Sequence, residues 1–204
     1  MSRAVSRKAP DRRKLIGITT IVVIVVAVIV AVGLSSRQNA IVPQNATKAV
    51  GSASIKVGDT APEFSVQTNA GPFDLASVST PVLLEVFATW CPHCQRETSV
   101  LNAIAAKYQG KLAIVAVSGD AFNMDHNGPE SLADVNTFGA TYNVRYPIAF
   151  DPDLKVAQAY LKDGFPTLVL ISHDKKITWM QDGEVPPAAL ESAIKGVVGS
   201  STGT

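Results

Sequence analysis

The chain has 204 residues with a formal net charge of only +1, and 47% of the residues are hydrophobic. The whole-chain value is an average, because outside residues 1–14 the chain has 12 basic and 16 acidic residues, a net charge of −4, which does not suggest a nucleic-acid-binding surface. With only two cysteines, the chain is also excluded from the small folds that several disulfides hold together.

The first 34 residues predict a cytoplasmic segment followed by a membrane span. Residues 15–34 carry no charge and are almost entirely aliphatic, and about 20 such residues cross a hydrocarbon core of about 30 Å. Six of the 18 basic residues, but one of the 17 acidic ones, lie in residues 1–14, so this end is predicted to stay inside. The remainder, with 12 basic and 16 acidic residues, then lies outside the cytoplasm. Removal of the span at Ala31-Val32-Gly33 as a signal peptide stays open.

Residues 35–54 predict a flexible linker, because they are rich in small and polar residues and show no sustained period. Residues 55–198 are numerous enough to form one hydrophobic core that needs no disulfide bonds for stability. Residues 199–204 predict a disordered tail. An oxidising compartment outside the membrane makes a disulfide between the two cysteines credible.

Apolar patterning predicts alternating strands and helices within residues 55–198. We expect an α/β fold, with a mixed central sheet flanked by helices, an N-terminal hairpin and an inserted strand–helix unit. The expected strands are 64–66, 73–75, 82–88, 112–117, 146–150, 167–171 and 176–180, and the expected helices are 92–108, 129–142, 151–161 and 186–198.

The two cysteines, Cys91 and Cys94, stand three positions apart where an apolar strand passes into a helix. At that spacing the two sulfurs lie close enough to form a disulfide. The first sulfur also faces the unpaired N–H groups of the first helical turn, which stabilise a thiolate. Because thiolates attack disulfides, we expect Cys91 to be the nucleophile and Cys94 the thiol that releases the product.

The motif F-A-T-W-C-P-H-C at residues 87–94, with Glu97 three residues on, resembles the TlpA-like branch of the thioredoxin superfamily. The opening V-G-D-x-A-P-x-F at residues 57–64 is similar to both TlpA-like proteins and peroxiredoxins. The resemblance implies a thioredoxin-like fold and a membrane-anchored thiol–disulfide oxidoreductase outside the cytoplasm, without metal or cofactor. Its substrates would be protein thiols and disulfides, and a membrane redox partner would recycle the pair.

The resemblance also implies which residues meet the substrate. Phe165-Pro166-Thr167 resembles the loop that faces the two cysteines, in which the proline is cis and the neighbouring backbone pairs with an extended peptide. Phe165 is larger than the residue expected there. Beside the cysteines, Trp90 and Pro92 are expected to contact the partner.

Two further side chains are expected to influence the chemistry of the pair, Glu85 through proton transfer and His93 through the reduction potential. Glu85 stands where many thioredoxins have a buried acid, so its pKa should rise and it should exchange a proton with Cys94, unless it reaches the sheet edge instead. A His93 ring that donates to the Cys91 sulfur would make the pair more oxidising, as in DsbA-like proteins with the same loop. If His93 is an exposed loop residue instead, it has no influence on the redox properties of the pair. Glu97 matches the acid of the TlpA-like branch or simply favours the helix N-terminus.

Two other functions stay open. A peroxiredoxin-type peroxidase needs threonine three residues before its reactive cysteine, where this chain has Ala88. A Cu(I) carrier would use Cys91 and Cys94, with His93 as a third ligand. Within the oxidoreductase interpretation, the direction is open: the chain either reduces partners such as apocytochrome c or donates its disulfide to exported proteins.

Overall fold

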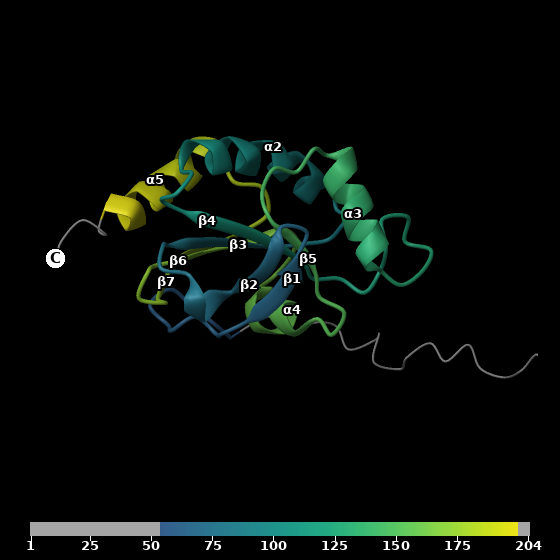
Figure 1. Cartoon of the computed structure of the whole chain (residues 1–204), viewed down its shortest axis with the longest axis horizontal. Coiled ribbons are helices and arrows are strands. Elements are labelled where there is room, and N and C mark those ends of the chain that lie inside the picture. Colours follow the sequence, from purple (N-terminus) through teal and green to yellow (C-terminus); the bar gives the residue numbers. More distant parts are fainter. Residues whose placement is uncertain (1–53, 200–204) are drawn as a thin grey trace, which may run out of the picture. The chain divides into compact units, whose positions relative to one another are not determined.

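The computed structural model describes residues 54–199, which form a seven-stranded mixed sheet with helices on both faces (Figure 1). The strand order is β2-β1-β5-β4-β3-β6-β7. This arrangement confirms the predicted α/β class and the N-terminal hairpin, β1–β2. The strands are β1 (Ser65–Thr68), β2 (Gly71–Asp74), β3 (Val82–Phe87), β4 (Ala113–Ser118), β5 (Ile148–Phe150), β6 (Thr167–Ile171) and β7 (Ile177–Asp182). The helices are α2 (Pro92–Lys107), α3 (Leu132–Thr141), α4 (Lys155–Tyr160) and α5 (Pro187–Val198), with a 3₁₀ turn, η2 (Leu75–Ser77).

Strand β3 lies at the centre of the sheet, parallel to β4 and antiparallel to β6. All of its residues are buried, as a strand covered on both faces requires. Because alternate side chains of a strand point to opposite faces, Leu83 and Phe87 enter one core and Leu84 and Val86 enter the other. Glu85 therefore points to the same face as Leu83 and Phe87.

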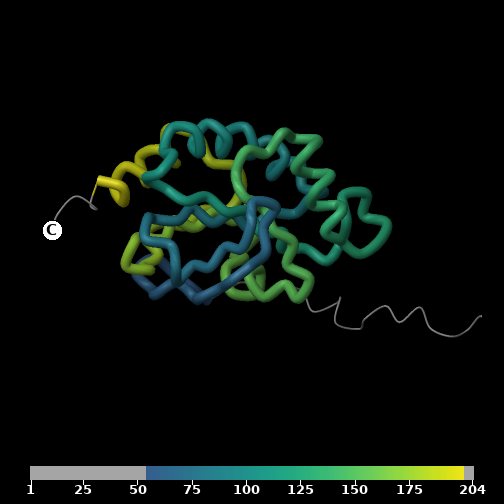
Figure 2. Tube along the Cα trace, viewed as in Figure 1, coloured from purple at the N-terminus to yellow at the C-terminus, as the bar shows by residue number. Residues whose placement is uncertain are grey.

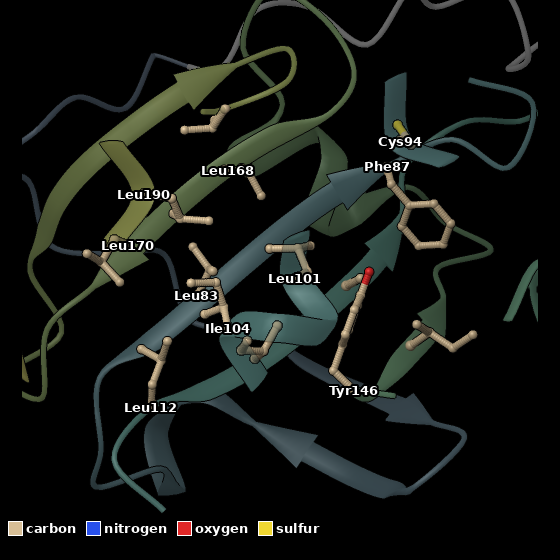
Figure 3. Close-up of a cluster of buried hydrophobic side chains, with 14 of the residues drawn as sticks. Leu83, Phe87, Cys94, Leu101, Ile104, Leu112, Tyr146, Leu168, Leu170 and Leu190 are labelled. Carbon is tan, nitrogen blue, oxygen red and sulfur yellow. The ribbon is translucent and has the colours of Figure 1, made fainter. Parts of the chain in front are cut away.

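The two cores are covered by different helices. The face that receives Phe87 is packed by α2, α3 and α5, which lie along the same side of the sheet (Figure 1). Figure 3 shows part of this core, with Leu101 and Ile104 of α2 and Leu190 of α5 above the strands. On the other face, α4 and η2 cover the sheet. This packing holds the first turn of α2 over the end of β3.

Two predicted helices begin three or four residues later than expected, and α5 begins one residue later, at Pro187. Helix α3 begins at Leu132 rather than 129, because Ser131 caps it in a reciprocal pair with Asp134. Helix α4 begins at Lys155 rather than 151, because the Asp151 carboxylate accepts the N–H of Val156 from outside the helix. The strand expected over 146–150 is likewise shorter, Ile148–Phe150, and β7 continues two residues beyond its expected end at 180.

The predicted cytoplasmic segment, the membrane span, nearly all of the linker and nearly all of the tail lie outside the described residues. Within residues 54–199, none of the helices combines the length and the apolar character needed to cross a membrane.

Candidate active site

The two cysteines lie at the start of α2. Cys91 is the N-cap residue, Pro92 opens the helix, and Cys94 lies in the first turn. Both are free thiols, and their exposed fractions are 4% and 0%. Both belong to the same core cluster as Phe87, and Figure 3 shows Cys94 at one end of that cluster. Because only Cys91 keeps an exposed fraction, it lies at the rim of the fold and Cys94 lies behind it.

The two thiols differ in proton affinity. A hydrogen bond from Cys94 lowers the pKa of Cys91 to about 6, against a burial effect in the other direction, and the backbone N–H groups of Cys94 and His93 add to the lowering. Burial raises the pKa of Cys94 far above its ordinary value, and its bond to Cys91 raises it further. At neutral pH Cys91 is therefore a thiolate and Cys94 a thiol, which is what an attacking and a releasing sulfur need.

Two buried carboxyl groups accompany Cys94. Glu85 is 2% exposed, and burial raises its pKa to about 8, with a further contribution from the charge of Glu97. It accepts a bond from the Tyr146 hydroxyl at 3.4 Å, so it does not reach the sheet edge. Glu97 is also buried, with a raised pKa, and accepts the N–H of Val185 at 3.1 Å. Because the charge of Glu85 raises the pKa of Cys94, the two groups are electrostatically coupled.

The loop before β6 faces the thiolate. The Phe165–Pro166 peptide bond is cis, and the Phe165 carbonyl oxygen lies 3.6 Å from the Cys91 sulfur. The Phe165 ring is half-buried against Gly119, where an added Cβ would come within 3.3 Å of it. Thr167 is fully buried, and its hydroxyl lies 2.9 Å from an oxygen of Asp182 inside the fold. Its side chain therefore holds the loop rather than facing a partner.

An aromatic group that the sequence did not reveal lies beside Trp90. The Trp90 ring is half-buried and makes edge contacts with Phe165 at 6.0 Å and with His126 at 4.7 Å between ring centroids. Phe122, which is 43% exposed, stacks on His126 at 5.0 Å. Both of these residues come from the loop of residues 119–131, which leaves β4 and returns to α3 (Figure 2). The loop adds apolar surface near Cys91.

The His93 ring meets a carboxylate rather than the thiolate. Its Nδ1 lies 2.6 Å from Glu184 Oε1 and 2.9 Å from Arg96 Nη2. Because a guanidinium has no acceptor, Nδ1 either donates to Glu184 or accepts from Arg96. Arg96 Nε also donates to Glu184 Oε1, at 2.8 Å. The expected bond from the ring to the Cys91 sulfur is not among the hydrogen bonds of the described residues.

Glu130 links the loop to the cysteine motif. Its carboxyl group is buried and accepts hydrogen bonds from the hydroxyl of Thr89, at 2.7 Å, and from the hydroxyl of Ser118. Burial raises its pKa to about 7. Thr89 precedes Trp90, so this group joins the end of β4, the start of α3 and the approach to Cys91. No local sequence pattern marks it, because its partners are 41 and 12 positions away.

Replacing Glu130 with alanine should destabilise the domain by about 1–3 kcal/mol, because the fully buried hydroxyls of Thr89 and Ser118 lose their acceptor. Urea unfolding measures the loss. Glu63→Ala removes an exposed carboxylate and is the matched control. Equal unfolding midpoints for the two variants would show that Glu130 does not hold the loop.

Comparisons with known proteins agree with this geometry. Residues 57–180 match the AhpC/TSA family. The thiol–disulfide oxidoreductase ResA of Bacillus cereus is 28% identical over 144 residues, which are 69% of this chain and 78% of that protein. ResA of Bacillus subtilis is 29% identical over 136 residues, 65% of this chain and 71% of that protein.

A solved structure extends the likeness to the fold. The putative thiol:disulfide interchange protein DsbE from Chlorobium tepidum superimposes with a TM-score of 0.63 at 29% identity. The match covers 71% of this chain and 99% of that one. The fold is therefore thioredoxin-like, as the resemblance implied. With its Cys91–Cys94 pair and its ResA- and DsbE-type homologues, the chain belongs to the AhpC/TSA family and is a thiol–disulfide oxidoreductase.

Proposed function

We propose that the chain is anchored in the membrane by residues 15–34 and reduces disulfides of protein partners outside the cytoplasm, such as the cysteine pair of an apocytochrome c. The observation that carries this proposal is the pairing of a Cys91 thiolate at the rim with a protonated Cys94 behind it. A partner disulfide can reach only the Cys91 sulfur, and the Cys94 sulfur reacts in the second exchange. The apolar span supports the location.

The reaction proceeds in two exchanges. The Cys91 thiolate attacks one sulfur of the partner's disulfide, so a mixed disulfide forms and the partner's other sulfur leaves as a thiolate. Cys94 then gives up its proton and attacks the Cys91 sulfur, which releases the partner with two reduced cysteines. Two electrons have passed to the partner, and the Cys91–Cys94 disulfide remains. A membrane redox partner must return two electrons to restart the cycle.

Glu85 is placed to take the proton from Cys94. With a pKa of about 8, it is ionised in about one molecule in ten at pH 7, and that fraction can act as the base. In the reverse direction, the protonated majority returns the proton to Cys94 as it leaves the disulfide. Glu97, also buried and with a raised pKa, shares the site.

The Cys-Pro-His-Cys loop favours a second function, donation of the disulfide to exported proteins. A cation in this loop stabilises the reduced form and makes the pair more oxidising. The reduction potential of the full-length chain against glutathione separates the two directions. A value of about −270 mV, the thioredoxin end of the range, supports a reductant, and a value of about −120 mV supports a disulfide donor.

Replacing Cys94 with serine should trap partners as mixed disulfides on Cys91, because serine cannot complete the second exchange. We expect covalent adducts with exported proteins when full-length Cys94→Ser is produced in cells, resolved on non-reducing gels and abolished by reductant. The Cys91→Ser, Cys94→Ser double variant is the control. Absence of adducts that depend on Cys91 would overturn the proposal.

A further inference from the structure

The Glu184 carboxylate contacts nitrogen atoms of both His93 and Arg96 beside the active site. Glu184 lies on the segment between β7 and α5, and its Oε1 lies 2.6 Å from His93 Nδ1 and 2.8 Å from Arg96 Nε. His93 and Arg96 are three positions apart in the first turns of α2, so they share one face of that helix. Cys91 caps the same helix end.

The segment that carries Glu184 is held against the active site on both sides. Gly183 donates its N–H to the Pro166 carbonyl oxygen at 2.8 Å, and Val185 donates its N–H to Glu97 at 3.1 Å. Glu184 is therefore fixed between the proline loop and α2. Its position beside His93 and Arg96 follows from backbone contacts, and not only from an exposed ion pair.

The electrostatic effect of this arrangement falls on the thiolate. The charge of His93 contributes to lowering the pKa of Cys91. The pKa of Arg96 is raised first by its hydrogen bond to Glu184 and, to a smaller degree, by the charge of Cys91. Arg96 therefore carries a positive charge that acts on Cys91, and both His93 and Arg96 are hydrogen-bonded to the Glu184 carboxylate. An ion pair that neutralises a cation weakens its field at a third charge.

We propose that Glu184 is a positioning residue that limits the oxidising power of the Cys91–Cys94 pair by holding the His93 ring and neutralising the charge of Arg96 beside the thiolate. The C-P-H-C loop alone stabilises the reduced form of the pair, and the negative charge of Glu184 opposes that stabilisation. The inference rests on thiol–disulfide exchange at Cys91 and does not depend on which protein is the partner. Glu184 thereby helps to set the direction proposed above, toward reduction of the partner.

The other titratable groups at this helix end lie on its inner side. Glu85 of β3 and Glu97 of α2 are buried, and the charge of Glu85 acts on Cys94. Tyr146 donates to Glu85. The proline loop presents the Phe165 carbonyl oxygen to the Cys91 sulfur. Of these groups, Glu97 feels the charge of Glu184, which contributes to its raised pKa. Glu184→Gln is therefore also measured in a Glu97→Gln background, where a changed potential reports on the outer cluster.

The test is the equilibrium of each full-length variant with glutathione. Two glutathione thiols reduce the protein disulfide and leave as glutathione disulfide, so no protein partner is needed. Glu184→Gln keeps the shape and removes the charge, and should raise the equilibrium constant for reduction about twofold to fivefold, which is about 10–20 mV at about 30 mV for each tenfold change. Arg96→Gln leaves the carboxylate without its main counter-charge and should lower the constant. Glu184→Asp should return it toward the parent value.

The chain offers a matched control at the far end of α2. Glu191 also lies beside two cations, Lys107 at 2.7 Å and Lys195 at 3.9 Å. Lys107 lies about 24 Å from Cys91 along the helix, well beyond the Debye length of about 8 Å at physiological salt. Glu191→Gln should therefore leave the equilibrium unchanged, and the Glu184→Gln effect should shrink in high salt.

Opposite shifts for Glu184→Gln and Arg96→Gln support the proposal, since a merely structural role would not reverse in sign. The proposal is overturned if Glu184→Gln leaves the constant unchanged or lowers it, if Arg96→Gln raises it, or if Glu191→Gln moves it equally. A failure to trap partners with Cys94→Ser would leave these results unaffected, so the two proposals fail separately.

Discussion

Alkylation of Cys91 should be half-maximal near pH 6, whereas an ordinary cysteine reaches half its maximal rate near pH 9. The thiolate is the reactive form, so the rate follows its population. At pH 7 a pKa of about 6 leaves about nine-tenths of Cys91 ionised, against about one-hundredth for a thiol with a pKa of 9. Cys91→Ser should lose this reactivity and all disulfide exchange, because a serine hydroxyl does not ionise in this range.

Replacing Cys94 with alanine tests what lowers the pKa of Cys91. The hydrogen bond from Cys94 is the largest contribution to the lowering, so the alkylation midpoint of Cys94→Ala should move up toward 9. Iodoacetamide labelling followed by mass spectrometry measures the midpoint. If it remains near 6 in Cys94→Ala, the helix N–H groups and His93 stabilise the thiolate without help from the second thiol.

Glu85→Gln should make the reduced domain more stable at alkaline pH and slower to release its partner. Folded Glu85 keeps its proton up to about pH 8, whereas the unfolded chain loses it near the ordinary value of 4.5. The stability that this proton provides is complete below pH 4.5 and is lost as the pH rises through 8. Each tenfold difference in proton affinity is about 1.4 kcal/mol, so the loss is on the order of 5 kcal/mol.

Glutamine removes this titration, and urea unfolding at pH 5 and pH 9 measures the difference. The parent and Glu85→Gln should be similar at pH 5, and the variant should be more stable at pH 9. Glu63→Gln, at an exposed site, is the control. A parent and a variant that lose stability equally between pH 5 and pH 9 would contradict the raised pKa.

The kinetic consequence of Glu85→Gln falls on the second exchange. Without a base near Cys94, release of a mixed disulfide should slow on the order of 10²-fold, while attack by Cys91 is unchanged. Stopped-flow measurement of a disulfide peptide separates the two phases. If Glu97 acts as a second base, release in Glu85→Gln will slow by less than this. The Glu85→Gln, Glu97→Gln double variant will then release its partner more slowly than Glu85→Gln.

Local patterns were sufficient for the fold class and for the pair of cysteines. The apolar run of β3, the proline after Cys91 and the helical spacing of Leu101 and Ile104 all lie within one continuous stretch, residues 82–104. The sequence placed two helix starts too early, because the Ser131 side chain caps α3 and Leu154, with φ 54°, precedes α4 in a left-handed conformation.

Tertiary structure alone decided what surrounds the thiolate. Glu184 meets His93 across 91 positions and Thr89 meets Glu130 across 41, and no sequence period connects such pairs. The contact between His93 and Glu184 depends on the segment after β7, which is held by the Pro166 carbonyl oxygen and by Glu97 of α2. The sequence by itself determined that Cys91 and Cys94 form the site of exchange. The packing of distant segments raised the pKa of Cys94 by burying it, whereas the lowered pKa of Cys91 comes mainly from its close neighbours Cys94 and His93.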